Sequence, residues 1–128
     1  MSNQFSGVGN LGTDPEVRFV KGERGDIPVA EMRVYFDRPV PNGQGGYENK
    51  GGFWLTVSLW GSRAESTARI LKKGTRVQVD GILREENCTN PENEQERSAL
   101  RLTASRIGID PICIQSIAYR NTKQEVAA

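Results

Sequence analysis

The chain has 128 residues, enough for one domain with a hydrophobic core. Charged residues make up 26% of it, the formal net charge is +1, and histidine is absent. No run of about 18 apolar residues indicates a membrane span, and the lack of histidine, the commonest general acid–base residue, argues against catalysis. Because the N-terminus has no secretory signal pattern, we expect a cytoplasmic protein.

The sequence holds no motif for a cofactor, a metal ion or a catalytic nucleophile. Cys88 and Cys113 lie far apart and without the spacing of metal ligands. The glycines of "GVGNLG" (7–12) lack the spacing of a dinucleotide-binding loop, and Pro15 follows too soon for the helix that such a loop needs. We therefore expect no catalytic residue, no metal and no cofactor.

The first third of the chain has the pattern of short β-strands. The segment "QFSGVGNLG" (4–12) predicts a glycine-rich strand, and "DPEVRFV" (14–20) predicts a short extended piece. Residues 29–36 alternate: Ala30, Met32, Val34 and Phe36 share one face, and Glu31, Arg33 and Tyr35 share the other. Residues 37–52 contain "PVPNGQGG" and predict a loop.

The segment "FWLTVSLW" (53–60) carries the only two tryptophans of the chain. In a strand, one face holds Phe53, Leu55, Val57 and Leu59, and the other holds Trp54, Thr56, Ser58 and Trp60. The first set predicts a core face. The second set is polar except at its two ends, which carry the largest rings available. Either these rings face solvent for a ligand, or the helix, a loop or another subunit covers one of them.

The periodicity then changes to that of a helix. Ser62 and Glu65 have the spacing of a capping box, and Gly74 follows two lysines. Ala64, Ala68 and Leu71 form a narrow apolar stripe, so we predict a helix of about three turns within residues 62–74.

Two further strands complete the pattern. In residues 75–84 we expect Val77 and Val79 to point inward, with Gly81 at a bulge or bend. Residues 85–97 predict a loop, and the last strand, within 98–107, has inward Leu100, Leu102 and Ala104.

Three strands, one helix and two strands form the plan of the OB-fold, an all-β barrel of five strands in Greek-key order with a helix between strands 3 and 4. This barrel binds oligonucleotides and oligosaccharides on the face of its strands 2 and 3. Here that face carries Arg33, Tyr35, Trp54 and Trp60. Outward aromatic rings stack on bases of any sequence, and arginines neutralise phosphates. We predict that Trp54, Trp60 and Tyr35 stack on the bases of a nucleic acid.

Four blocks also resemble the bacterial single-stranded DNA-binding protein (SSB) family: "VGNLGTDPEVRFV" (8–20), "VAEMRV" (29–34), "WLTVSLWG" (54–61) and "LKKGTRVQVDGILR" (71–84). The resemblance covers roughly residues 4–106. It implies an OB-fold domain (1–106), sequence-independent binding of single-stranded DNA in replication, recombination or repair, and no enzymatic activity. It also implies a homo-oligomer, for which we prefer a tetramer over a dimer.

The family's functional positions carry over only in part. Trp54 and Trp60 match stacking positions, and Arg18, Lys73 and Arg84 match basic positions. The predicted phosphate contacts are Arg18, Arg33, Lys73, Arg76 and Arg84. Two further aromatic positions of well-studied members fall at Val40 and Cys88, and Thr56 and Glu86 stand where such relatives carry basic residues.

Residues 85–96 contain five glutamates and no basic residue. This stretch is either a solvated loop or one that repels DNA or binds another protein. The second possibility supports an alternative function, an OB-fold module for protein–protein interaction with weakened nucleic-acid binding.

Residues 107–128 are rich in isoleucine and too apolar for a free linker, so we expect this extension to pack on the barrel or on a neighbouring subunit. Residues 107–128 do not have the acidic composition of the tail with which family members dock replication partners, so we expect no such docking. The expected partners are single-stranded DNA and further copies of the chain. We expect no association with a membrane.

Overall fold

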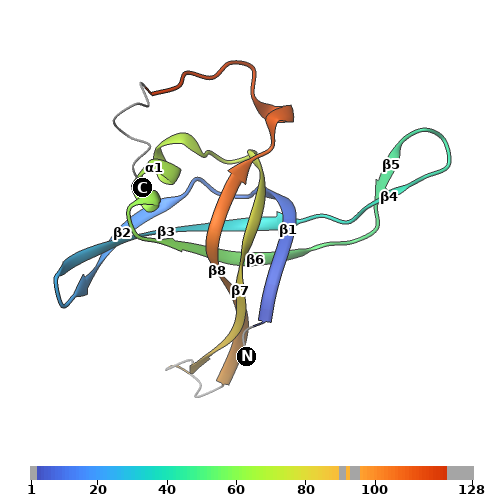
Figure 1. Ribbon diagram of the computed structural model, residues 1–128. Helices are drawn as coiled ribbons and strands as arrows, with labels where there is room; N and C mark the ends of the chain where they lie inside the picture. Colours follow the sequence, from blue (N-terminus) through green and yellow to red (C-terminus); the bar gives the residue numbers. More distant parts are fainter. Residues whose placement is uncertain (1–2, 90–91, 93–95, 121–128) are drawn as a thin grey trace.

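Five strands close into a barrel, to which one further strand and a small hairpin are attached (Figure 1). The computed structural model describes residues 3–89, 92 and 96–120. The strands are β1 (Asn3–Leu11), β2 (Glu16–Gly22), β3 (Gly25–Phe36), β4 (Pro39–Pro41), β5 (Tyr47–Asn49), β6 (Phe53–Trp60), β7 (Arg76–Thr89) and β8 (Glu96–Ile109). The helix α1 (Arg63–Ile70) lies between β6 and β7, and a 3₁₀ turn, η1 (Pro111–Cys113), follows β8.

The strand order β1-β7-β8-β6-β3-β2 becomes a closed ring because β1 also pairs with β3. This closure consists of two residue pairs, Asn10 with Tyr35 and Leu11 with Val34. Strand β2 pairs with β3 outside the ring, and β6 and β8 run parallel to each other. Within the described residues, the helix follows the third barrel strand and precedes the fourth, so the predicted OB-fold plan is confirmed.

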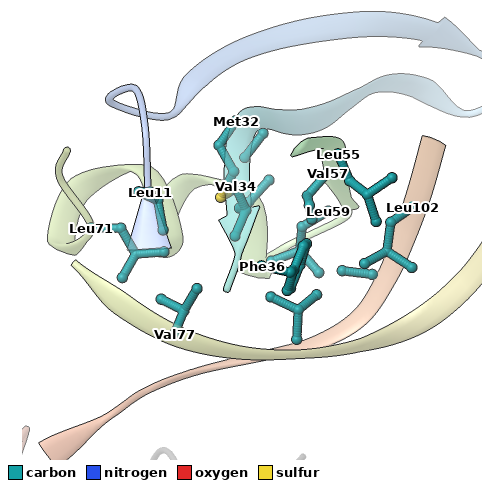
Figure 2. Close-up of a cluster of buried hydrophobic side chains, with 14 residues drawn as sticks. Leu11, Met32, Val34, Phe36, Leu55, Val57, Leu59, Leu71, Val77 and Leu102 are labelled. Carbon is teal, nitrogen blue, oxygen red and sulfur yellow. The ribbon is translucent and has the colours of Figure 1, made fainter. Parts of the chain in front are cut away.

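The inward faces of the barrel strands form one core (Figure 2). Figure 2 shows side chains of β1, β3, β6, β7 and β8 converging on it, with Leu71 at one end. The predicted inward residues of β3 are all buried, as are Val77, Val79, Leu102 and Ala104. Alternation in the sequence therefore identified most of the core correctly.

Two residues predicted to point into the core are exposed. Phe53 is 49% exposed because it is the first residue of β6, at the barrel end, where it packs on Phe36 and Phe5 at ring distances of 5.7 and 6.1 Å. Leu100 is 52% exposed because pairing of β8 with β6 begins only at Arg101. On the predicted wet face, Ser58 is buried.

The helix is shorter than predicted and begins without a capping box. It spans Arg63–Ile70, about two turns, and the Ser62 side chain makes no capping hydrogen bond. The Ser62 backbone is already helical, so its side chain does not have the geometry of a cap. The chain becomes extended at Leu71, which is buried in the core.

Both predicted loops contain strands. β4 and β5 pair within residues 37–52, and this hairpin stands away from the barrel in Figure 1. β7 and β8 continue through much of the predicted loop 85–97, with register pairs out to Thr89 and Glu96. The predicted bulge at Gly81 is confirmed by a register shift between Asp80 and Gly81.

The described part of the C-terminal extension begins packed against the core and then becomes exposed. Ile107 and Ile109 pack against the core. Ile112, Ile117 and Tyr119 are exposed, and residues 121–128 lie outside the described part of the chain. Packing of this extension on a neighbouring subunit stays a prediction. Throughout the described residues, no helix has the length and hydropathy needed to cross a membrane.

Candidate nucleic-acid interface

The outward side chains of β3 and β6 form a surface that we call the platform: Glu31, Arg33, Tyr35, Trp54, Thr56 and Trp60. The register places Tyr35 beside Trp54 and Arg33 beside Thr56. Trp54 and Trp60 are 49% and 42% exposed, so both rings offer surface to a ligand. Trp60 lies six positions after Trp54 along the strand, a distance of about 20 Å at 3.3 Å per residue.

Three neighbours hold the Trp54 ring in place. The Tyr35 ring lies 5.2 Å away between centroids, and the Arg33 guanidinium carbon lies 5.5 Å from the indole centroid. The Trp54 ring also rests against Gly12, where a β-carbon would overlap it. An aromatic ring that is fixed but half-exposed is suited to stacking, because little side-chain freedom remains to be lost on binding.

Arg33 brings a positive charge across the platform to β6. Its Nη1 donates a hydrogen bond of 3.1 Å to Oγ1 of Thr56. Thr56 occupies a position at which the resemblance to the SSB family implies a basic residue. The guanidinium from the neighbouring strand therefore supplies a cation over that position, next to Trp54.

The middle of the platform is occupied by a chain of alternating charges. Glu31 pairs with Arg18 at 2.6 Å and with Arg101 at 3.9 Å, and Arg101 pairs in turn with Glu86 at 2.8 Å. These ion pairs link β2, β3, β8 and β7. They pass over β6, which lies between β3 and β8 in the sheet and carries the small side chains Thr56 and Ser58 at the crossing point.

The remaining predicted phosphate contacts have different surroundings. Lys73 is exposed in the loop after α1, where its backbone N–H donates to Asp14 at 2.7 Å. Arg84 is exposed on β7, opposite Arg101. Arg76 is 26% exposed and is paired with Asp37 at 3.1 Å and with Asp110 at 3.7 Å.

The structure thus gathers some of the predicted residues and separates others. Arg33 and Tyr35 each contact Trp54, and Arg18 reaches the platform through Glu31. Arg76 is held by two carboxylates in a separate cluster. Of the two lost aromatic positions, Val40 lies in the β4–β5 hairpin, and the Cys88 side chain falls outside the described part.

Sequence reasoning missed Arg101, although the signal was present. Leu100, Leu102 and Ala104 were placed on the inward face of the last strand, so Arg101 had to point outward. Its parallel pairing with Thr56 then places it at the platform. That pairing was not predictable, because strand order across a barrel is not encoded in local alternation. Among the side chains that the structure describes, no group of acidic, histidine or cysteine residues suits a metal ion.

Known proteins resemble this chain in sequence and in fold. The model of the single-strand binding protein family matches residues 2–110. The single-stranded DNA-binding protein of Paenarthrobacter aurescens is 32% identical over 118 residues, which are 91% of this chain and 63% of that protein. Single-stranded DNA-binding protein 3 of Listeria innocua is 30% identical over 127 residues, 99% of this chain and 69% of that protein. The chain therefore spans about two thirds of the length of these relatives.

The structural comparison supports the same barrel. The crystal structure of a small single-stranded DNA-binding protein from Streptomyces coelicolor superposes with a TM-score of 0.71 at 22% identity. The match covers 86% of this chain and 95% of that chain.

Proposed function

Because this chain belongs to the single-strand binding protein family, we propose that it binds single-stranded DNA on the platform. The observation that carries the proposal is the pair of half-exposed tryptophans, Trp54 and Trp60, on the outward face of a central barrel strand. We assign the binding to the barrel, residues 1–106, and propose a role in replication, recombination or repair.

Stacking explains how such a surface binds without sequence preference. Every base has a π-face, and each base stacked on an aromatic ring contributes roughly 1–3 kcal/mol. Trp54, Trp60 and Tyr35 provide the rings, and Arg33 adds a cation beside Trp54. Binding of this kind involves no reaction, so the proposed function is that of a binding protein and not of an enzyme.

Phosphate neutralisation provides the second contribution. Arg18, Arg33, Lys73 and Arg84 are exposed, and with Arg76 they form the proposed set of phosphate contacts. Each contact to a single strand lowers the log–log slope of affinity against salt by about 0.7. Because carboxylates engage two of these arginines, Arg18 and Arg76, we expect a modest slope, on the order of −2 to −4 per subunit.

One titration tests the proposal. Oligo-dT is added to the protein at two salt concentrations, and tryptophan emission is recorded. Quenching of most of the emission, with an affinity that falls as salt rises, supports stacking plus phosphate contact. If oligo-dT leaves the emission unchanged and does not bind, the proposed function is wrong.

We further propose that the protein assembles with copies of itself, as a tetramer in preference to a dimer. Two surface features support assembly. Residues 3–9 of β1 pair with β7 on one side. In the described part of the chain β3 pairs with β1 at Asn10 and Leu11 alone, so the other edge of residues 3–9 has no strand partner there. Ile112 and Ile117 add exposed apolar surface. Light scattering at micromolar concentration measures the mass, and the mass of one chain would exclude assembly.

A cytoplasmic location is part of the same proposal, and family membership supports it.

One observation favours the alternative of a protein–protein interaction module. Carboxylates pair with Arg18 and Arg101 at the place where DNA phosphates are expected. If this pairing abolished DNA binding, the platform would serve a protein partner. The oligo-dT titration separates the two functions, because the interaction module predicts weak binding or none even at low salt.

A further inference from the structure

We propose that the Glu31 carboxylate competes with DNA phosphate for Arg18 and Arg101. This competition lowers both the affinity of the platform for DNA and the dependence of that affinity on salt. The proposal rests on the function proposed above and identifies a residue that regulates it. Glu31 holds Arg18 and Arg101 through its carboxylate, so these two cations are already neutralised before DNA arrives.

The position of Glu31 is what makes the competition direct. In the register of β3 and β6, Glu31 lies opposite Ser58, which is between Trp54 and Trp60 along the platform. A strand whose bases stack on both rings must cover the distance of about 20 Å between them. The phosphates of the DNA strand therefore pass close to Glu31. If the Glu31 carboxylate is unpaired it repels them, and if it is paired with Arg18 and Arg101 it keeps these arginines from binding them.

A DNA phosphate can reach both arginines that Glu31 engages. Arg18 is 58% exposed and Arg101 is 34% exposed in their side chains, so both remain accessible to a phosphate. The Glu31 side chain is 29% exposed, and ion pairs that water and salt still reach are weak because they are screened. DNA phosphate can therefore replace the carboxylate, and the cost of this replacement is subtracted from the binding free energy.

Glu86 extends the same arrangement on the other side of Arg101. Its Oε2 lies 2.8 Å from Nε of Arg101, whereas the Glu31 carboxylate lies 3.9 Å from Nη1 of that arginine. Glu31 thus engages Arg18 most closely and shares Arg101 with Glu86. Removing the charge of Glu31 frees Arg18 fully and Arg101 in part.

The test is the substitution Glu31→Gln, which removes the charge and keeps the shape. We expect oligo-dT to bind roughly 3- to 10-fold more tightly at low salt, with a log–log salt slope steeper by about 0.7 for each arginine released. The matched control is Glu16→Gln. Glu16 pairs with Glu31 in the β2–β3 register and has no ion pair among the described residues, so its removal changes net charge equally without freeing an arginine.

A second variant shows whether the gain comes through the arginines. In Glu31→Gln combined with Arg18→Gln and Arg101→Gln, the gain and the steeper slope should both disappear. Thermal melts of all variants establish that each one is folded. Glu86→Gln gives a second route to the same answer, because it releases Arg101 alone and should give a smaller gain.

The outcomes separate this inference from the proposed function. If the unaltered protein binds oligo-dT and Glu31→Gln binds equally or more weakly, Glu31 is not a competitor, although the platform still binds DNA. A gain that Glu16→Gln reproduces reflects net charge alone and also overturns the inference. If neither the unaltered protein nor any Glu31 variant binds oligo-dT, the proposed function fails, and the inference fails with it.

Discussion

The indole of Trp54 lies directly against Gly12, so that a β-carbon at position 12 would stand 2.6 Å from Cη2 of the ring. Real β-carbons essentially never make so close a contact. Gly12 lies just after β1, and its N–H donates to the carbonyl of Arg33 on β3 at 2.8 Å. The glycine therefore fixes how deeply the Trp54 ring, which we propose stacks on DNA, sits on the barrel.

The substitution Gly12→Ala should displace the Trp54 ring and weaken binding of oligo-dT. Most of the roughly 1–3 kcal/mol that one stacked base contributes is then lost. The matched control is Gly108→Ala, since a β-carbon there meets nothing within 4 Å. Titration and thermal melts of both variants check the prediction. Equal affinities for Gly12→Ala and Gly108→Ala would mean that the ring position has no importance for binding.

Trp54→Ala and Trp60→Ala should each weaken binding by roughly 1–3 kcal/mol. Both rings are about half exposed, so the loss of stability should remain below the roughly 3–5 kcal/mol that a buried aromatic costs. Since these are the only tryptophans, each variant also isolates the quenching of the other ring. A large fall in melting temperature with unchanged affinity would show that the ring is structural.

Arg33 and Arg76 should respond differently when each is replaced by glutamine. Arg33 contacts Trp54 and Thr56, so Arg33→Gln should lower affinity and reduce the salt slope by about 0.7. Arg76 is largely covered and paired with Asp37 and Asp110, so Arg76→Gln should reduce stability by about 1–3 kcal/mol and should change the salt slope less than Arg33→Gln does. Affinity at several salt concentrations, with melting curves, distinguishes them. A slope change for Arg76→Gln equal to that for Arg33→Gln would contradict this division.

The acidic stretch should affect DNA binding through only some of its glutamates. Glu86 contacts Arg101, whereas Glu85 pairs with Leu100 in the register and so lies on the opposite face of β7. Glu86→Gln should therefore tighten binding of oligo-dT more than Glu85→Gln. The two variants have the same net charge, which makes each the control for the other. Identical affinities would show that this part of the β7–β8 hairpin stays away from the DNA.

Assembly should depend on the apolar residues of the C-terminal extension. Ile112 and Ile117 are 83% and 59% exposed, so in an isolated chain these apolar side chains are in contact with water. Replacing both by aspartate should lower the mass measured by light scattering. Phe19→Asp on β2 is a suitable control, because Phe19 is 58% exposed and lies outside the extension. An unchanged mass for the double variant would place the subunit contact elsewhere.

The barrel was predictable because its core alternates cleanly along β3, β6 and β7. Met32, Val34, Leu55, Val57 and Val77 all follow period two, and each is buried. The same reasoning identified Trp54 and Trp60 as outward. It was wrong at Phe53 and Leu100, since alternation gives the side of a strand and not where the barrel ends.

The two hairpins were missed for a different reason. Polar, proline-containing and acidic sequences such as residues 37–52 and 85–97 carry low strand propensity. In the structure β4 pairs with β5, and the outer part of β7 pairs with β8, so that backbone hydrogen bonding sustains both pairs of strands. The ionic chain through Glu31 and Arg101 was unpredictable as well, because it depends on which strands are neighbours in the ring.

The way in which the ring closes also governs how the chain reaches its native state. β1 pairs along its length with β7, so that Asn3 meets Leu83 and Asn10 meets Arg76. The seam with β3 then adds only two residue pairs. No early fragment of the chain contains all the strands of the ring, and most of the pairing connects distant segments. We therefore expect folding to be slow for a domain of this size, on the order of milliseconds to seconds, and to end with β1 joining the other strands.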